Sequence, residues 1–499
     1  MKRTLLHDDV VFATPAADST AYAKYGATVV AAGGAHASDY VNKLKRCGLH
    51  VAGSISCLSA HSHDLHANAD LAAAVARDIA GEPIAAIQPA QGAIAAAPRY
   101  FGCVNHPAFR AYVRRKVCDA IAGGAEGLHI DDHLGSAASL SHGGCFCEYC
   151  MSGFAGYLLK QNDPTLAATA GVASFDGFDY RAFVNAHVSS PEQYLNTAAS
   201  FPLHNEFVDF QLSSAADNVV ALGKLAEDVA GRPLSLSANA TLPALDHAVV
   251  LPRLTYCASE IDHNAPDAGL GLQTAISAYR MAEAIGIPVA ATATPRDWAF
   301  VNSRRADSLV TLWIALAYAC GQRFMAPNRM PCAAADAAAH WYCGPASTFS
   351  PLYAFVRKHG FLLNDFAAVG PLARPDGIPL TLETSAKRDA LFSALAIPPA
   401  APLTAGSGAW VFPRAKGDGA IAIHVVNHAY NVNSQRVERL SNVEVRLPNR
   451  IFNRIFTDAT AYSYGAEPAK LTVQTEGDSS VFVLPELNLW SIVTFEYWA

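Results

Sequence analysis

The sequence predicts an α/β protein that consists of a (β/α)8 TIM barrel and a C-terminal antiparallel β-sandwich. Between about residues 27 and 345, short apolar segments alternate with longer segments of helical periodicity, as in repeated βα units. After residue 409, apolar residues recur at every second position, which is typical of half-buried strands. No Gly-x-Gly-x-x-Gly turn follows the first strand, and the βα repeat runs for eight units. A closed barrel is therefore favoured over an open doubly wound sheet.

Eight segments are predicted to form the barrel strands. They span residues 27–34, 50–58, 98–104, 127–134, 234–240, 254–262, 287–295 and 323–330. Helices are predicted between them where apolar residues recur at three- and four-residue spacing, namely over 107–121, 206–230, 272–285 and 308–320. We expect the catalytic barrel to occupy residues 1–345.

A second unit is expected after the barrel. Residues 346–408 are predicted to hold a helix, over 350–366, and a linker rich in Pro, Ala and Gly. Residues 409–499 are predicted to form the sandwich, with strands over 420–426, 443–447, 470–473, 481–484 and 490–496.

Composition narrows the classes of partner. The formal net charge is −7 and no run of Lys and Arg is present, so nucleic acid is not expected as a partner. No apolar stretch reaches the roughly 18 residues of a membrane-spanning helix, and His7-Asp8-Asp9 interrupts the start of any signal peptide. The eleven cysteines do not form a compact disulfide framework, which favours the cytoplasm. A homo-oligomer is left open.

Three closely spaced thiols indicate a metal site. Cys145, Cys147 and Cys150 have the spacing C-x-C-x2-C, which allows them to converge on one cation. Cys103 is the natural fourth ligand, because neighbouring βα loops lie side by side at the top of a barrel. Four thiolates predict a closed, structural zinc site that performs no chemistry. The alternative is a set of free buried thiols, or one strained disulfide with an unpaired thiol.

These segments resemble the family 42 β-galactosidases and their relatives. The resemblance covers about 60 residues: Gly102-Cys103-Val104-Asn105-His106-Pro107, then His129-Ile130-Asp131-Asp132-His133, then the run from Cys145 to Cys150 and the helix after it. It implies zinc at the four cysteines and a catalytic acid at Asp132. The chain departs from the family by having Asp131-Asp132 in place of Asn-Glu, and by lacking room between 345 and 409 for a trimerisation domain. We therefore expect a distant relative and infer no β-galactoside substrate.

Paired carboxylates at strand ends predict glycosidic bond cleavage. This chemistry needs one carboxyl group to protonate the departing oxygen and a second to attack the anomeric carbon or activate water. Asp131 and Asp132 end the fourth predicted strand, and Glu260 ends the sixth. We expect Asp132 and Glu260 to be the catalytic pair, with Asp131 as neighbour or substitute. The strand order is similar to α-galactosidase-like barrels, which place an aspartate nucleophile on strand four and an acid on strand six.

Further polar and aromatic residues at strand ends are candidates for sugar binding. Aromatic faces stack on sugar rings, and amides or guanidinium groups bind hydroxyl pairs and carboxylates. The candidates are Asn239, His263, Asn264, Arg296, Trp298, Asn328, Arg329, Trp341 and Tyr342. An arginine that binds a carboxylate, either Arg296 or Arg329, would indicate a uronide.

The predicted function is a glycoside hydrolase, retaining and exo-acting, on a carbohydrate substrate. Two alternatives remain open. His61, His63 and His66, together with Asp64, are spaced so that they could hold a catalytic metal in a hydrolase or lyase of another class. The barrel could also bind carbohydrate without catalysis, in which case Asp132→Asn and Glu260→Gln would leave its function intact.

Overall fold

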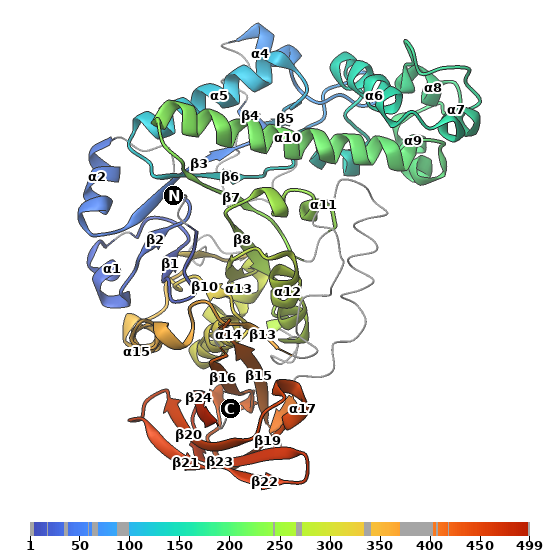
Figure 1. The fold of residues 1–499 in the computed structure, drawn as a ribbon. Coiled ribbons are helices and arrows are strands. Elements are labelled where there is room, and N and C mark those ends of the chain that lie inside the picture. Colours follow the sequence, from blue (N-terminus) through green and yellow to red (C-terminus); the bar gives the residue numbers. More distant parts are fainter. Residues whose placement is uncertain are drawn as a thin grey trace.

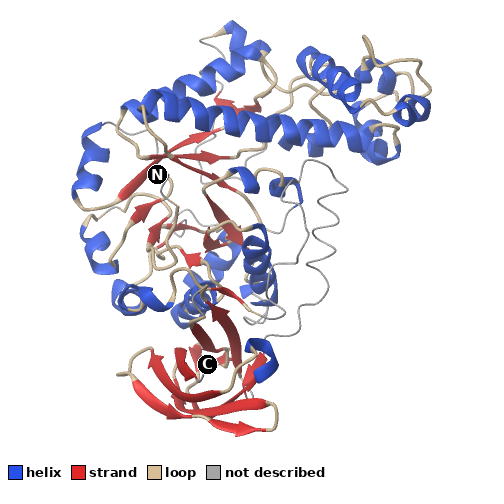
Figure 2. Cartoon of the chain, viewed as in Figure 1, coloured by secondary structure: helices blue, strands red, loops and turns tan. Residues whose placement is uncertain are grey.

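The computed structural model has a barrel at one end and two antiparallel sheets at the other (Figures 1 and 2). It describes residues 4–16, 18–33, 38–57, 59–61, 68–86, 99–242, 245–265, 272–333, 341–369, 403–405, 408–417 and 419–497. Within these ranges, no helix is long and apolar enough to cross a membrane.

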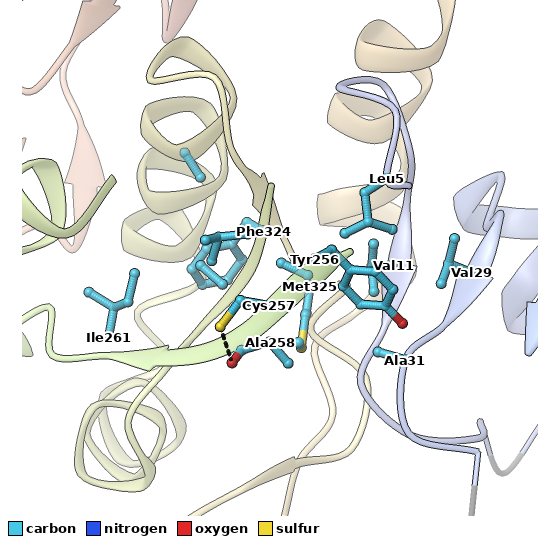
Figure 3. Close-up of a cluster of buried hydrophobic side chains, with 14 of the residues drawn as sticks. Leu5, Val11, Val29, Ala31, Tyr256, Cys257, Ala258, Ile261, Phe324 and Met325 are labelled. Atoms are coloured by element: carbon cyan, nitrogen blue, oxygen red, sulfur yellow. Dashed lines mark hydrogen bonds between the residues drawn. The ribbon is translucent and has the colours of Figure 1, made fainter. Parts of the chain in front are cut away.

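The barrel is an eight-stranded parallel sheet, as the sequence predicts. Its strands, in order around the sheet, are β1 (Val11–Phe12), β2 (Val29–Val30), β3 (His50–Ser56), β6 (Gly127–Asp131), β7 (Ser235–Asn239), β8 (Tyr256–Ile261), β9 (Val289–Ala293) and β10 (Arg323–Phe324). The amide of Ala326, just after β10, donates to the carbonyl of Val11 at 2.8 Å, which brings the last strand to the first. Buried side chains of β1, β2, β8 and β10 gather in one cluster (Figure 3).

Two of the predicted barrel assignments need correction. Residues 98–104 do not form a barrel strand: β5 (Arg99–Phe101) pairs antiparallel with β4 (Ser59–His61) in a separate two-stranded sheet. The barrel still has eight strands because β1, which was not predicted from the sequence, adds one at the start of the sheet. The two corrections compensate, so that β6 and β8 are still the fourth and sixth strands of the barrel.

Helices on the outside of the barrel follow the predicted periodicity. The helices that begin and end near the predicted positions are α5 (Pro107–Ala122), α10 (His204–Ala230), α12 (Leu272–Ile285) and α14 (Asp307–Ala319). After the barrel, α15 (Ala346–Lys358) overlaps the helix predicted over 350–366 but begins four residues and ends eight residues earlier. Shorter helices are α1 (Thr20–Tyr25), α2 (Ser38–Arg46), α4 (Ala69–Ala73), α11 (Leu245–Ala248) and α13 (Pro295–Arg304). Buried apolar residues of α10, α12 and α14 lie in the same core as the barrel strands.

A helical lobe is inserted between β6 and β7. It contains η1 (Gly135–His142), α6 (Glu148–Gln161), α7 (Pro164–Ala170), α8 (Tyr180–Asn185), α9 (Pro191–Thr197) and η2 (Ala198–Ser200), and α10 leads from it back to the barrel (Figure 1). A core of its own packs aromatic rings such as Phe146, Phe154 and Phe207 against one another. The lobe therefore has its own hydrophobic support, separate from the barrel core.

The C-terminal part is an antiparallel β structure built from two sheets. The larger sheet contains β13 (Ala367–Ala368), β15 (Ala409–Ala415), β16 (Ile421–Asn427), β24 (Trp490–Tyr497), β20 (Phe456–Ser463) and β21 (Ala469–Thr472), and β14 (Leu403–Ala405) pairs with β15. The smaller sheet contains β19 (Leu440–Pro448), β23 (Ser479–Leu487) and β22 (Gln474–Glu476). A short helix, α17 (Asn449–Phe452), and the pair β17 (Tyr430–Asn431) and β18 (Arg436–Val437) lie between strands. Apolar residues of both sheets share one core, as in a sandwich.

The barrel and the C-terminal sheets pack directly on each other. Trp490 of β24 contacts Tyr318 of α14 and Phe355 of α15, with ring centroids 6.4 Å and 5.2 Å apart. In addition, the buried guanidinium of Arg414, on β15, binds Glu283 of α12 at 2.8 Å. The outer face of the larger sheet thus closes one side of the barrel core.

Candidate active site

A cavity of about 290 Å³ opens at the C-terminal ends of the barrel strands, where active sites of such barrels lie. Its volume is close to the lower end of the roughly 300–1,000 Å³ typical of small-molecule sites. It is lined by Ala13, Thr14, Ala31, Ala32, Ser54, His129, Asp131, Asn239, Ala258, Ser259, Glu260, Thr292, Met325, Arg329, Met330, Pro331 and Trp341. Two carboxyl groups from different strands therefore face one cavity.

Asp131 is the last residue of β6 and lines the cavity. Its Oδ1 accepts a hydrogen bond from Nδ2 of Asn239, at 3.3 Å, and from the backbone amide of Asp132, at 3.1 Å. Asn239 ends the neighbouring strand β7 and lines the same cavity. These two hydrogen bonds fix the orientation of the Asp131 carboxylate.

Asp132 lies one residue beyond the strand and does not line the cavity. Its backbone has a φ of 50°, so the chain turns away from the strand direction at this residue. Its Oδ2 accepts a hydrogen bond from Oγ of Ser56 at 3.4 Å. Burial, and secondarily the charge of Asp131, raises the pKa of Asp132 to about 6. Asp132 can therefore hold a proton near neutral pH.

Glu260 is the second carboxyl group in the cavity and is positioned by β8. Burial raises the pKa of Glu260, and the nearby charges of Asp131 and Asp132 raise it further. A carboxyl group with a raised pKa beside a hydrogen-bonded carboxylate is the combination that separates an acid from a base or nucleophile. The cavity thus holds both groups that two-carboxylate chemistry requires.

The other predicted sugar-binding residues divide into two groups. Asn239, Arg329 and Trp341 line the cavity. The remaining candidates, which are His263, Asn264, Arg296, Asn328, Trp298 and Tyr342, are not among its lining residues.

Two of these remaining candidates are core residues. Trp298 is fully buried, and its Nε1 donates to Oγ1 of Thr292 at 3.1 Å. His263 is also fully buried, with its ring centroid 4.6 Å from that of Trp313. A residue's position near a strand end does not show whether its side chain faces the cavity or packs in the core behind it.

Several lining residues were not singled out from the sequence. Ser54 and His129 are paired in the β3–β6 ladder, and His129 precedes Asp131 by two positions. That spacing places His129 on the same face of the strand as Asp131, and it is the signal that could have identified it. Burial lowers the pKa of His129 to about 4, so its ring is neutral at neutral pH, with Nδ1 2.9 Å from Oγ of Ser237.

The four predicted cysteines meet in the helical lobe. Cys103, Cys145, Cys147 and Cys150 are buried, form no disulfide, and have ligand atoms within 4.8 Å of one another. Sγ of Cys103 lies 3.5 Å from the sulfurs of both Cys147 and Cys150.

The surroundings of the cluster hold it in place. Nε2 of Gln211, on α10, donates to the carbonyl of Cys145 at 3.1 Å, and Nδ2 of Asn105 lies 3.4 Å from Sγ of Cys150. The cluster can hold a metal ion.

The alternative metal site, predicted at the histidines between residues 61 and 66, lies almost entirely outside the described residues. His63, Asp64 and His66 belong to the part of the chain that the structure does not describe, and only the backbone of His61 is described, in β4. The prediction of a catalytic metal there stays a prediction.

Comparison with known proteins supports a relationship to carbohydrate-active enzymes. An alpha-agarase from Thalassotalea agarivorans is 24% identical over 285 residues, covering 53% of this chain and 18% of the agarase. The chain is a distant homologue of an alpha-agarase. It spans less than a fifth of that protein's length. No family model matches the chain, so the resemblance to family 42 stays a prediction.

Comparison with solved structures identifies enzymes that have the same fold. Alpha-L-fucosidase isoenzyme 2 from Paenibacillus thiaminolyticus matches with a TM-score of 0.55 and 11% identity, covering 99% of this chain and 100% of that chain. The maltogenic alpha-amylase AmyB from Thermotoga neapolitana matches with a TM-score of 0.50 and 10% identity, covering 97% and 99%. The barrel with C-terminal sheets is therefore the fold of known TIM-barrel glycoside hydrolases.

Replacing Asp132 with Asn is expected to stabilise the protein at neutral pH. The pKa of Asp132 is about 6 in the folded state against an ordinary aspartate value of 3.8, so ionisation opposes folding once the pH rises above the lower value. The gain in the free energy of unfolding should grow between about pH 4 and pH 6 and stay at about 1–3 kcal/mol above that range. Urea titrations from about pH 5 to pH 8 measure it.

The matched control for this variant is Asp228→Asn, which changes an exposed carboxylate on α10. It should change the free energy of unfolding by less than about 0.5 kcal/mol, as is usual for a surface substitution. A stabilisation by Asp132→Asn that is equally large at about pH 5 and pH 8 would contradict the argument.

Proposed function

We propose that this protein is a glycoside hydrolase that cleaves O-glycosidic bonds with two carboxyl groups. The observation that carries the proposal is the shared cavity of Asp131 and Glu260, at the C-terminal ends of β6 and β8. Two further observations support the same class of reaction. The chain has the same fold as the fucosidase and the amylase, and it is distantly homologous to an alpha-agarase.

We assign the acid to Glu260 and the nucleophile to Asp131. Glu260, whose pKa is raised, holds the proton that passes to the glycosidic oxygen as the bond to the anomeric carbon breaks. Asp131, held by Asn239 and the Asp132 amide, supplies the electron pair that attacks that carbon. In the second step Glu260, now ionised, takes a proton from water as the water oxygen bonds to the anomeric carbon. The bond between that carbon and Asp131 breaks, which frees the sugar and returns Asp131 as a carboxylate. Asp132, with its own raised pKa, is the alternative acid.

The reaction is proposed to be retaining and exo-acting. A covalent intermediate on Asp131 inverts the anomeric carbon twice, so the configuration of the sugar is retained. A cavity of about 290 Å³ suits the end of a sugar chain better than its interior.

The four cysteines are proposed to hold a structural zinc ion. Sulfur atoms at the corners of a tetrahedron around zinc are about 3.8 Å apart, given a Zn–S bond of about 2.3 Å. The sulfur separations of 3.5 Å, and the overall limit of 4.8 Å, suit that arrangement. All four donors are protein atoms, so the ion would hold the loop before α6 and take no part in the reaction. The cytoplasmic location inferred from cysteine usage belongs to this proposal, since a reducing compartment keeps the thiols available.

The proposal is tested by incubating the protein with a panel of nitrophenyl glycosides and oligosaccharides. The panel includes agar-derived, fucose-containing and maltose-type substrates, because the related proteins are named for these classes. We expect release of one sugar from a chain end, with the anomeric configuration retained in the first product seen by NMR. An inverted first product would reject the nucleophile assignment, and binding without hydrolysis would favour the non-catalytic barrel.

A further inference from the structure

An unpaired guanidinium lies at the mouth of the cavity. Arg329 is exposed and lines the cavity together with Trp341, and its Cζ lies 4.8 Å from the centroid of the Trp341 ring. In the described part of the chain, Arg329 makes neither an ion pair nor a side-chain hydrogen bond. Its five N–H donors are therefore available to a ligand.

The backbone fixes this arginine and tryptophan relative to each other. Arg329 directly precedes β11 (Met330–Pro331), which pairs antiparallel with β12 (Trp341–Tyr342), so that Pro331 lies opposite Trp341. Arg329 has a φ of 58°, a conformation that non-glycine residues adopt rarely and only where the surrounding structure holds them. The amide of Gly344 donates to the carbonyl of Pro327 at 2.9 Å, which fastens the base of this ribbon.

The charges and the exposed ring in the cavity favour a particular kind of ligand. Among the described lining residues, Arg329 is the only Lys or Arg, and it forms no ion pair with Asp131 or Glu260. Hydroxyl groups of a neutral sugar can be bound by lining residues such as Asn239 and Thr292. A planar guanidinium is suited instead to an oxyanion, to which it can donate two parallel hydrogen bonds. Trp341 is 46% exposed, so the part of its ring that Arg329 does not cover can stack on a sugar.

We propose that the cavity accepts a sugar carrying an oxyanion, either a sulfate ester or a uronic carboxylate. Arg329 donates to the oxyanion, and Trp341 stacks on the ring of the same sugar or its neighbour. This inference rests on the proposed glycosidase function, because it names the substrate class of the same cavity. The oxyanion would lie at the rim, away from the acidic pair of β6 and β8.

The test uses one oligosaccharide that the wild type cleaves, in its neutral, sulfated and C6-carboxylate forms. We expect the wild type to have the highest kcat/KM on one of the two anionic forms. Arg329→Gln should raise KM for that form about 10- to 100-fold and change KM for the neutral form by less than about threefold. Arg329→Lys should restore part of the preference, because it keeps the charge but loses the fork of donors. Arg304→Gln, which changes an exposed arginine of α13, is the matched control.

The outcomes separate this inference from the function on which it rests. The oxyanion site would be overturned if the wild type prefers the neutral form and Arg329→Gln changes KM equally for all three forms. The glycosidase proposal would then still stand. If the wild type cleaves none of the forms, the glycosidase proposal fails, and calorimetric titration with the sulfated and carboxylate forms decides the oxyanion site. Binding that is lost in Arg329→Gln would support that site, and no binding to the wild type would reject it.

Discussion

Glu260→Gln is expected to lower kcat about 10²- to 10⁴-fold on a glycoside with a poor leaving group. The amide cannot deliver the proton that the departing oxygen needs, whereas the shape of the cavity wall is kept. On a dinitrophenyl glycoside, whose leaving group needs little protonation, formation of the intermediate should be nearly as fast as in the wild type. Steady-state and pre-steady-state kinetics on both substrates measure the difference.

The control for this variant is Asp262→Asn, two residues further along the same segment. Asp262 is exposed and accepts a hydrogen bond from the amide of Asn264 at 2.7 Å, and it does not line the cavity. It should leave kcat within about twofold of the wild-type value. Wild-type turnover by Glu260→Gln on both substrates would remove Glu260 from the mechanism, and the same experiment on Asp132→Asn would then decide whether Asp132 is the acid.

Cys147→Ser is expected to lower the free energy of unfolding by more than about 4 kcal/mol, because loss of a metal ligand is among the most destabilising single changes. The wild type should contain about one zinc per chain by mass spectrometry of metals, and the variant much less. Chelation of the wild type should reproduce the variant's lower melting temperature. A protease should cut the variant and the chelated wild type first within residues 145–203, because the thiol cluster holds the start of the helical lobe.

Cys47→Ser is the matched control, since Cys47 is an exposed thiol outside the cluster. It should change neither the metal content nor the melting temperature. Absence of metal from protein expressed in zinc-supplemented medium, together with an unchanged melting temperature of Cys147→Ser, would leave the four residues as buried free thiols.

The sequence predicted most of the barrel because its longer strands combine apolar character with flanking turns. It missed β1, which is two residues long, although β2 and β10 are equally short and lie within predicted strands. The difference lies in the polar residues His7, Asp8 and Asp9 just before β1, which hid its apolar character. His7 is buried, with its ring nitrogens 2.7 Å and 2.9 Å from the carbonyls of Leu363 and Tyr318, contacts that come from more than 300 residues away.

The wrong assignment at 98–104 has a different cause. The segment is apolar because its end is buried in the lobe, where Cys103 joins the thiol cluster. A local pattern reports that a segment is buried, but not which core buries it. The antiparallel partner of β5, β4, supplies that information only in three dimensions.

The sequence placed one carboxyl group of the predicted pair at Asp132, one residue beyond Asp131, which lines the cavity. Asp131, the last residue of β6, and Asp132, the residue after it, were both candidates, but the pattern could not decide which one faces the cavity. The decision depends on the backbone turn at Asp132, where φ becomes positive. Similarly, Trp298 and Trp341 are both aromatic residues near strand ends, yet one is fully buried and the other is 46% exposed. That difference arises from the β11–β12 ribbon, whose pairing is non-local.

The contact of Trp490 with α14 and α15 has a consequence for protein engineering. The buried cluster of the barrel strands also contains Trp410, Phe412, Trp490 and Ile492. A chain cut near residue 408 would therefore expose to water the apolar surface of α14 and α15 that Trp490 covers. The C-terminal sheets are thus no detachable module that can be deleted or swapped for another enzyme's. Library designs that alter substrate choice should keep both parts together and vary the rim of the cavity.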